Sequence, residues 1–360
     1  MRLIATKSVK PGMILAHPIF NEKGQPLLRE GVSLTERLID RLNQYKITYV
    51  YIADSASEGI KATSSISEAE RLRAVKTIEN TLRMINNSSS LSTMTVLEKN
   101  TKQLKGIVST ILEAIKGNQD VLNVLVDVYS YDSYIYQHSY NVTLYSLAIG
   151  VGLQLPRKQL EVLGLGALLH DVGKVKVPRE ILLKPGKLTD EEFEVVKKHT
   201  EFGFELLRRL HTVPLVAAHC AYQHHERLNG SGYPRGIKGD EMHEFAKIIA
   251  VADVYDAVTS NRVYRKAMLP HEGLELLYSG AGTLFDSSIV EAFRKSISIY
   301  PVGVTVELSD GRKGIVAKQN KGVTDRPHIR ITEQNGQPLQ QPYEMNLQEH
   351  LGVTIVKCEA

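Results

Sequence analysis

Cysteine is scarce in this sequence of 360 residues. Only Cys220 and Cys358 are present, and they do not stand in C-x-x-C spacing. Two such residues suggest neither a disulfide framework nor a thiolate zinc site. A reducing cytoplasm is the compartment that fits this composition best.

Long apolar runs and concentrated positive charge are also absent. Residues 1–11 have no apolar core of signal-peptide length, and no stretch approaches the ~20 apolar residues that span a bilayer. The net charge is +4 and the pI is about 8.8, with charges of both signs dispersed. This falls short of the basic face of a protein that binds duplex nucleic acid. We therefore expect a cytoplasmic protein with no membrane span and no nucleic-acid duplex as partner, whereas a small anionic substrate is compatible.

The length leaves room for two or three domains, and a hydrophobic content of 42% supports a buried core. Most of the chain has helical periodicity interrupted by short loops marked by proline and glycine. The patterns predict a multidomain, mainly α protein. In chain order we expect a small α+β domain (1–54), a linker (55–66), connecting helices (67–120), an all-helical domain (121–298) and a small β-rich domain (299–360).

Local signals support the predicted connecting helices. Ser67 and Glu70 form a capping-box pattern, and apolar residues then recur at helical spacing through residues 72–85 and 97–115. Such helices either pack on the next domain or pair between two subunits. Core packing is the simpler interpretation, and a homodimer stays open as the alternative.

The last part of the chain changes to a strand pattern. Val304, Val306 and Leu308 alternate with polar residues, and Asp310-Gly311 and Asn335-Gly336 are typical of hairpin turns. We therefore predict antiparallel strands here.

Potential metal ligands are concentrated within residues 138–253. Eight of the twelve histidines of the chain lie there. Five of these histidines and two aspartates stand on helical stretches or at their ends, where the spacing directs them inward. Imidazole and carboxylate ligands together suit iron, manganese or zinc, and a bridging carboxylate lets two ions share one site. The candidate ligands are His138, His170, Asp171, His199, His224, His225 and Asp253.

Taken alone, each of these histidines is more often a satisfied core residue or a surface residue than a ligand. That interpretation fails for the whole set, because burying the groups without partners would cost roughly 1 to 3 kcal/mol for each. Metal coordination removes this cost. The nearby His211, His219 and His243 lack this joint support and are not predicted as ligands.

The ordered motifs resemble the HD-GYP subgroup of HD-domain phosphohydrolases, which are bacterial cyclic di-GMP phosphodiesterases. The resemblance covers roughly residues 121–298, about half of the chain, and an ordered set of this kind is far more specific than one His-Asp pair. Its segments are His138-Ser139-Tyr140-Asn141-Val142, His170-Asp171-Val172-Gly173-Lys174, Lys198-His199, His224-His225-Glu226-Arg227, Gly230-Ser231-Gly232-Tyr233-Pro234, and Ala252-Asp253 through Arg265.

The resemblance implies two divalent metal ions bridged by Asp171. By resemblance, His138, His170 and Asp253 complete one site, and His199, His224 and His225 complete the other. Some family members hold a third ion through a glutamate one helical turn before the first histidine, but Tyr134 stands there in this chain. Two metals are therefore expected, iron or alternatively manganese, since both accept this ligand set.

The same resemblance implies hydrolysis of 3′,5′-cyclic di-GMP to pGpG, to GMP, or to both, through a metal-activated bridging hydroxide. Asp171 and Lys174 are the predicted catalytic residues, and the predicted substrate contacts are Lys174, Tyr233, Arg262 and Arg265. Asp256 is interpreted as a structural hydrogen-bonding residue. The alternatives are a catalytically silent cyclic di-GMP receptor and a hydrolase of another cyclic dinucleotide; the regulatory partner is unknown.

Overall fold

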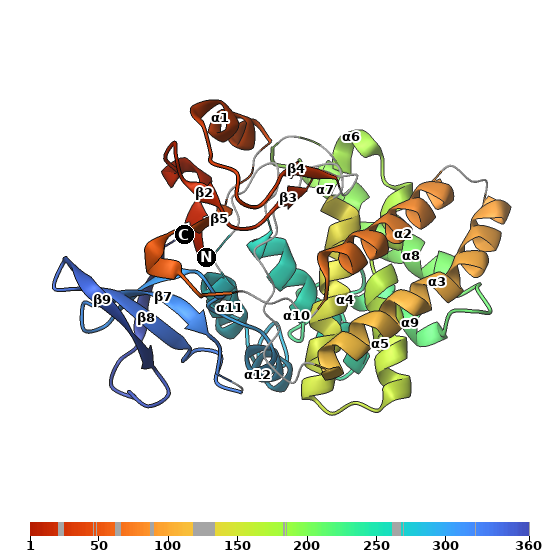
Figure 1. Ribbon diagram of the computed structural model, residues 1–360. Coiled ribbons are helices and arrows are strands. Elements are labelled where there is room, and N and C mark those ends of the chain that lie inside the picture. The colour runs from red at the N-terminus through yellow and green to blue at the C-terminus, as the bar shows by residue number, and fades with distance from the viewer. Residues whose placement is uncertain are drawn as a thin grey trace.

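The computed structural model describes residues 1–20, 25–45, 47, 49–61, 66–86, 90–117, 134–182, 184, 186–260, 268, 270–320 and 322–359. A helical body occupies one side of the molecule, and the strands of both chain ends lie together on the other (Figure 1). The mainly α class is confirmed, with β structure restricted to small antiparallel sheets in the described part of the chain.

The N-terminal unit is a small α+β fold. It contains a sheet of order β1-β5-β2 and a separate β3-β4 pair, and Thr35 caps α1 by accepting a hydrogen bond from Leu38 N. The elements are β1 (Arg2–Ala5), β2 (Ile14–Leu15), β3 (Ile19–Phe20), β4 (Pro26–Leu28), α1 (Glu36–Gln44) and β5 (Tyr49–Ala53).

The C-terminal unit is a five-stranded antiparallel sheet of order β10-β6-β7-β8-β9. Both predicted hairpin turns are present, because Gly311 (φ 81°) lies between β6 and β7, and Asn335 (φ 53°) and Gly336 (φ 74°) lie between β8 and β9. The strands are β6 (Thr305–Leu308), β7 (Lys313–Lys318), β8 (His328–Gln334), β9 (Gln337–Asn346) and β10 (Ile355–Glu359).

The two ends of the chain share one hydrophobic core. The backbone N–H of Leu3 donates to Gly303 O at 2.8 Å, and the amino terminus of Met1 donates to the carbonyls of Ser57 and Ile60 at 2.9 and 2.7 Å. Both Ser57 and Ile60 are buried, although they fall in the segment predicted as a linker. The shared core includes Leu3, Tyr51, Ile60, Val302, Val304, Val306, Leu308, Ile315, Val316, Ile329, Ile331, Met345 and Leu347.

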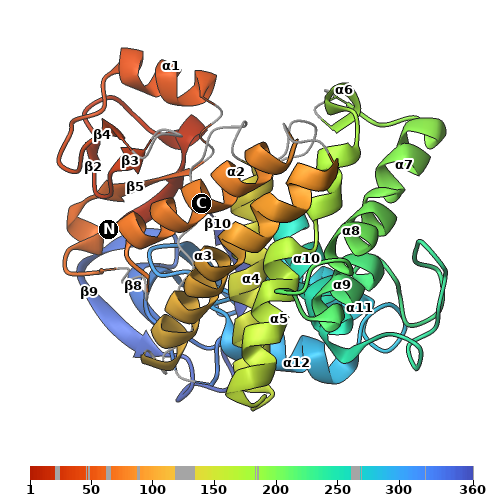
Figure 2. The same cartoon turned by 90° about the vertical axis from the view of Figure 1, so that its right-hand side faces the viewer.

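The connecting helices α2 (Glu68–Asn86) and α3 (Ser90–Gly117) pack against the helical body, so the prediction of core packing is confirmed (Figure 2). Ser67 and Glu70 form the predicted capping box, with Ser67 N donating to Glu70 Oε2 at 3.1 Å and Glu70 N donating to Ser67 Oγ at 3.3 Å. The apolar stripe of α3 faces a cluster that also contains residues of the next two helices.

The helical body consists of packed helices that surround a polar centre. Its elements are α4 (Tyr134–Gly152), α5 (Arg157–Leu169), the 3-10 helix η4 (Val172–Lys176), α6 (Arg179–Leu182), α7 (Asp190–Lys197), α8 (His199–Leu207), α9 (Leu215–Gln223), α10 (Glu244–Thr259), α11 (Pro270–Ser279) and α12 (Ser287–Ser296). Thr189 and Glu192 form a capping box that begins α7. The helical spacing of Val196, His199 and Leu206 predicts one continuous helix through His199. The helix is instead interrupted at Lys198, so His199 begins a separate helix. None of the described helices has the length and apolar character of a membrane span.

Candidate metal centre

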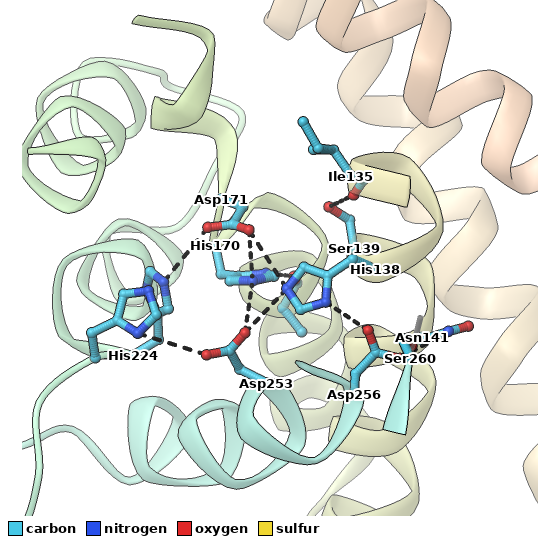
Figure 3. A network of polar contacts seen from close by, with 12 residues as sticks. Ile135, His138, Ser139, Asn141, His170, Asp171, His224, Asp253, Asp256 and Ser260 are labelled. Atoms are coloured by element: carbon cyan, nitrogen blue, oxygen red, sulfur yellow. Dashed lines mark hydrogen bonds and ion pairs between the residues drawn. The ribbon is translucent and has the colours of Figure 1, made fainter. Parts of the chain in front are cut away.

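The seven predicted ligands meet in one buried place, contributed by α4, the end of α5, α8, the end of α9, and α10. The relative exposure of His170, His199 and His224 is 0%, and that of Asp171 is 2%. Figure 3 shows the two aspartates lying between His138 on one side and His224 on the other.

The two carboxylate oxygens of Asp171 face different histidines. Oδ2 lies 3.6 Å from His138 Nε2 and 3.4 Å from His170 Nε2. Oδ1 lies 3.3 Å from His199 Nε2 and 3.7 Å from His224 Nε2. A carboxylate arranged in this way can bridge two cations that are each held by histidines.

Asp253 also reaches both sides of the centre. Its Oδ1 lies 3.1 Å from His138 Nε2 and 3.9 Å from His170 Nε2, whereas its Oδ2 lies 3.7 Å from His225 Nδ1. The ligand atoms fall into two compact groups that share Asp171. One contains His138, His170 and Asp171, and the other contains Asp171, His199, His224 and His225.

The second nitrogen of four histidines is held by an acceptor. Carbonyl oxygens accept from His170 Nδ1 (Ala167 O, 2.7 Å), His199 Nδ1 (Val196 O, 2.7 Å) and His224 Nδ1 (Ala221 O, 3.0 Å). A carbonyl accepts hydrogen bonds only, so each of these Nδ1 atoms carries a proton, and each Nε2 is directed at the centre. Such outer contacts fix the tautomer and orientation of metal-binding histidines.

His138 lies within a helix and is held by a side chain instead. Asp256 Oδ2 accepts from His138 Nδ1 at 2.7 Å, and Asp256 Oδ1 accepts from Asn141 Nδ2 at 2.9 Å and from Ser260 Oγ at 3.1 Å. The interpretation of Asp256 as a structural hydrogen-bonding residue agrees with these contacts. Through the contact with Nδ1, Asp256 also orients His138, a predicted ligand.

Two buried atoms of the centre lack a hydrogen-bond partner among the described residues, His170 Nε2 and Asp171 Oδ1. Leaving a buried polar atom unsatisfied costs about 1 to 3 kcal/mol, and more for a charged group. Both atoms are good ligands for a divalent cation, so the residues present fit the pair of metals that the sequence predicts.

The electrostatics keep the centre in a form that suits cations. Burial, reinforced by the neighbouring histidines, lowers the pKa of His224 and His225 well below the usual range, and burial lowers the pKa of His199 to about 4. These imidazoles are therefore neutral. Burial would raise the pKa of Asp171, but Lys174 and His170 outweigh it and hold that pKa well below its ordinary value.

His138 behaves differently from the other imidazoles. Burial would lower its pKa, but hydrogen bonds to Asp253 and Asp256 outweigh burial and raise the pKa to about 9. In the protein without cations, a proton on His138 therefore offsets part of the negative charge of the two aspartates. A cation held at this position would take over that role.

The predicted substrate contacts lie beside the centre where the structure describes them. Lys174 is half-buried, and its Nζ donates to Asp171 Oδ2. The ring of Tyr233 stacks on His225 with centroids 4.6 Å apart. Burial raises the pKa of Tyr233, with Asp253 adding to the effect, so the phenol stays protonated. Arg262 and Arg265 lie outside the described residues.

Glycine is required at two close approaches around the centre. A Cβ at Gly173 would lie 1.9 Å from His199 O, so η4 touches the start of α8 directly. A Cβ at Gly232 would lie 2.4 Å from both Glu226 Cα and His225 O. The Gly-Tyr-Pro loop is thereby packed against the His224-His225 pair, and the Tyr233-Pro234 peptide bond is cis.

Two residues at this site were not singled out from the sequence. Phe193 and Lys197 of α7 lie next to Tyr233. Their signal was available, because an exposed aromatic residue and a lysine one helical turn apart share a face, but surface residues of an amphipathic helix show the same pattern.

Comparisons with known proteins agree with these motifs. A family model described as HD domain matches residues 123–289. The cyclic di-GMP phosphodiesterase PA4108 of Pseudomonas aeruginosa is 36% identical over 231 residues, which are 64% of this chain and 56% of that protein. The cyclic di-GMP phosphodiesterase response regulator RpfG of Xanthomonas campestris is 43% identical over 141 residues, 39% of this chain and 37% of that protein.

A relative with another stated substrate is also similar. The 3′3′-cGAMP-specific phosphodiesterase 3 of Vibrio cholerae is 36% identical over 164 residues, 46% of this chain and 35% of that protein. The chain thus spans 56% or less of the length of these three relatives. Among solved structures, the chain is similar to Bd1817, a HDG"Y"P protein from Bdellovibrio bacteriovorus. The alignment covers 81% of this chain and 97% of that chain, with 18% sequence identity and a TM-score of 0.44. A TM-score of this size supports no functional argument.

Proposed function

We propose that the chain is a member of the HD-GYP family of HD-domain phosphohydrolases and a cyclic di-GMP phosphodiesterase, which hydrolyses 3′,5′-cyclic di-GMP to pGpG, to GMP, or to both; the HD-domain match and the similar phosphodiesterases support this. The observation that carries the proposal is the placement of Asp171. Its two buried oxygens face two separate pairs of histidines.

We propose Asp171 as the bridging ligand of two divalent ions. His138, His170 and Asp253 complete the first site, and His199, His224 and His225 complete the second. Iron is the metal we propose, with manganese as the alternative, because both accept mixed nitrogen and oxygen ligands. When bound, such a pair supplies the Lewis acidity that activates water and offsets phosphate charge.

The other residues of the centre position the substrate. Lys174 provides a cation beside Asp171, where the negatively charged phosphodiester enters, and one cation at this place offsets charge that builds up in the transition state. The protonated phenol of Tyr233 shapes the side of the pocket next to His225. Arg262 and Arg265 remain proposed phosphate contacts on the basis of the sequence.

The outer contacts maintain this arrangement. With Nδ1 of each of four histidines held by a carbonyl or by Asp256, the Nε2 atoms need no rearrangement when cations bind. We also propose a cytoplasmic location, because both cysteines are free and a cyclic dinucleotide signal is intracellular chemistry.

The test is turnover by protein purified without oxygen and loaded separately with Fe²⁺ and Mn²⁺. Metal content and the products formed from cyclic di-GMP are measured on the same preparation. The proposal requires about two metals per chain and release of pGpG or GMP. Two bound metals without any product would overturn the phosphodiesterase proposal, and binding of the dinucleotide without product would support the receptor alternative. Faster cleavage of 3′3′-cGAMP would indicate the activity that the Vibrio relative is named for.

A further inference from the structure

Two aromatic rings and one ammonium group meet beside the metal centre. The rings of Phe193 and Tyr233 lie with centroids 6.1 Å apart and planes at 81°. Lys197 Nζ lies 4.9 Å from the centroid of Phe193 and 5.7 Å from that of Tyr233. The ammonium therefore lies within cation–π distance of both rings.

Phe193 does not contribute to any described hydrophobic core cluster. It is 43% exposed, and α7 contains no buried residue. A single exposed phenylalanine is ordinary on a protein surface. This one is placed against a residue of the site, because Tyr233 contacts Phe193 on one side and stacks on the predicted ligand His225 on the other.

We propose that Phe193 is the stacking platform for one purine of the substrate and that Lys197 selects guanine at this position. The inference rests on the proposed function, because it assigns a binding place to the base next to the phosphodiester that the metal centre would cleave. Stacking on an aromatic ring accepts any base because every base has a π-face. The choice between bases must then come from a polar group at the ring.

Lys197 has the chemistry for that choice. Guanine presents two hydrogen-bond acceptors on one edge, O6 and N7, whereas adenine presents N7 together with the N6 amino donor. A lysine ammonium is a donor only, so it binds the guanine edge and meets a like donor on adenine.

The present contacts of the Lys197 ammonium are weak, so it can leave them to bind a base. Its Nζ donates to Glu194 Oε1 at 2.5 Å, and the Glu194 side chain is 65% exposed. Exposed ion pairs and exposed cation–π contacts are both weak. The flexible ammonium can therefore exchange the ring faces for the O6 and N7 atoms of a purine that stacks on Phe193.

The test compares Phe193→Ala and Lys197→Met with two matched controls. Phe202→Ala removes another exposed phenylalanine, and Lys158→Met removes an exposed lysine on α5. The substrates are cyclic di-GMP, cyclic di-AMP and bis(p-nitrophenyl) phosphate, which carries no base. Metal content is measured for every variant.

Phe193→Ala is expected to raise KM for both dinucleotides by roughly 5- to 100-fold, the range for loss of one base–aromatic stack, and to leave cleavage of the base-free substrate unchanged. Lys197→Met is expected to reduce the preference for cyclic di-GMP over cyclic di-AMP by roughly 5- to 100-fold. Both controls should match the wild type. Equal losses on all three substrates, or an unchanged preference, would overturn the subsite.

Calorimetric binding of the two dinucleotides to the same metal-loaded proteins separates this inference from the proposed function. A wild-type protein that binds cyclic di-GMP without turnover refutes the phosphodiesterase but still tests the subsite. In that case, equal affinities of the wild type and Phe193→Ala, or no binding at all, refute the subsite.

Discussion

Replacing Asp256 with asparagine tests whether the outer contact of His138 holds the first metal site together. The carboxylate accepts from His138, Asn141 and Ser260 at 2.7 to 3.1 Å. Asparagine has nearly the same shape but only one acceptor oxygen, so its amino group must face one of these donors. If that donor is His138, the imidazole loses its fixed orientation and the proton at Nδ1 loses its acceptor.

Loss of such an outer contact reduces metal affinity by about 10- to 100-fold, which corresponds to roughly 1.4 to 2.7 kcal/mol. Asp256 contacts none of the ligands of the second site in the hydrogen bonds of the described residues. We therefore expect Asp256→Asn to lose one of two metals first during titration with a chelator, measured by elemental analysis after gel filtration, and to lose activity in parallel.

Asp286→Asn is the matched control. It makes the same chemical change at the N-cap of α12, where Asp286 accepts from Ser288 N and Ile289 N, and asparagine caps helices about as well as aspartate. Its metal content and activity should equal those of the wild type. If Asp256→Asn also keeps both metals at unchanged affinity, the orientation of His138 does not depend on Asp256 and the reasoning is wrong.

Further predictions follow from the bridging ligand, a close approach and the bound metals. Asp171→Ala should remove both metals and all activity together, and unchanged metal content in this variant would contradict the bridging assignment. Gly173→Ala should lower the free energy of unfolding by about 1 to 3 kcal/mol or more, because its Cβ would lie 1.9 Å from a backbone oxygen. Gly106→Ala on α3 meets no atom within 4 Å and should stabilise by about 0.5 to 1 kcal/mol, so denaturant unfolding of the pair checks the clash. Chelation should lower the melting temperature, since metal at 100 times its Kd contributes about 2.7 kcal/mol, and an unchanged melting temperature would argue against tight sites.

The helices and the inward direction of the candidate ligands could be predicted because both depend on local spacing. His138 shares its stripe with Val142 and Tyr145, and all three are buried. The bond between His138 and Asp256 joins residues 118 positions apart, and spacing within one helix contains no information about it. The division of the helix at Lys198 is likewise not visible in local spacing. At this point Gly173 packs closely against His199 O, a contact that is made only in the folded chain.

The packing of the two chain ends against each other could not be predicted from local sequence patterns, for the same reason. Alternation of apolar residues predicted strands in the C-terminal unit, but it does not state which surfaces those strands bury. In the structure Leu3 and Ile60 complete the core of the C-terminal sheet. A polar segment rich in small residues was expected to be a linker, yet its apolar residue Ile60 is 5% exposed because the sheet covers it.

Helix ends explain why most of the predicted ligands occur where helical periodicity stops. The last four carbonyls of a helix lack N–H partners within it. His170 and His224 are the C-caps of α5 and α9, and His199 follows the last turn of α7. Each uses Nδ1–H to satisfy one such carbonyl, and this same bond turns Nε2 toward the centre.

His138 is the exception among these histidines, because it does not lie at a helix end. It lies inside α4, where the carbonyls of the preceding turn already accept helical hydrogen bonds, so its Nδ1–H has no free backbone acceptor nearby. A carboxylate from another helix must take that place, and Asp256 of α10 does so. Asp256 lies three residues after Asp253 on the same helix face, so one helix supplies both a proposed ligand and the group that orients its neighbour. Of the four histidines with a held Nδ1, His138 is therefore the one whose orientation depends on a side chain, and the one that a single substitution outside the ligand set can release.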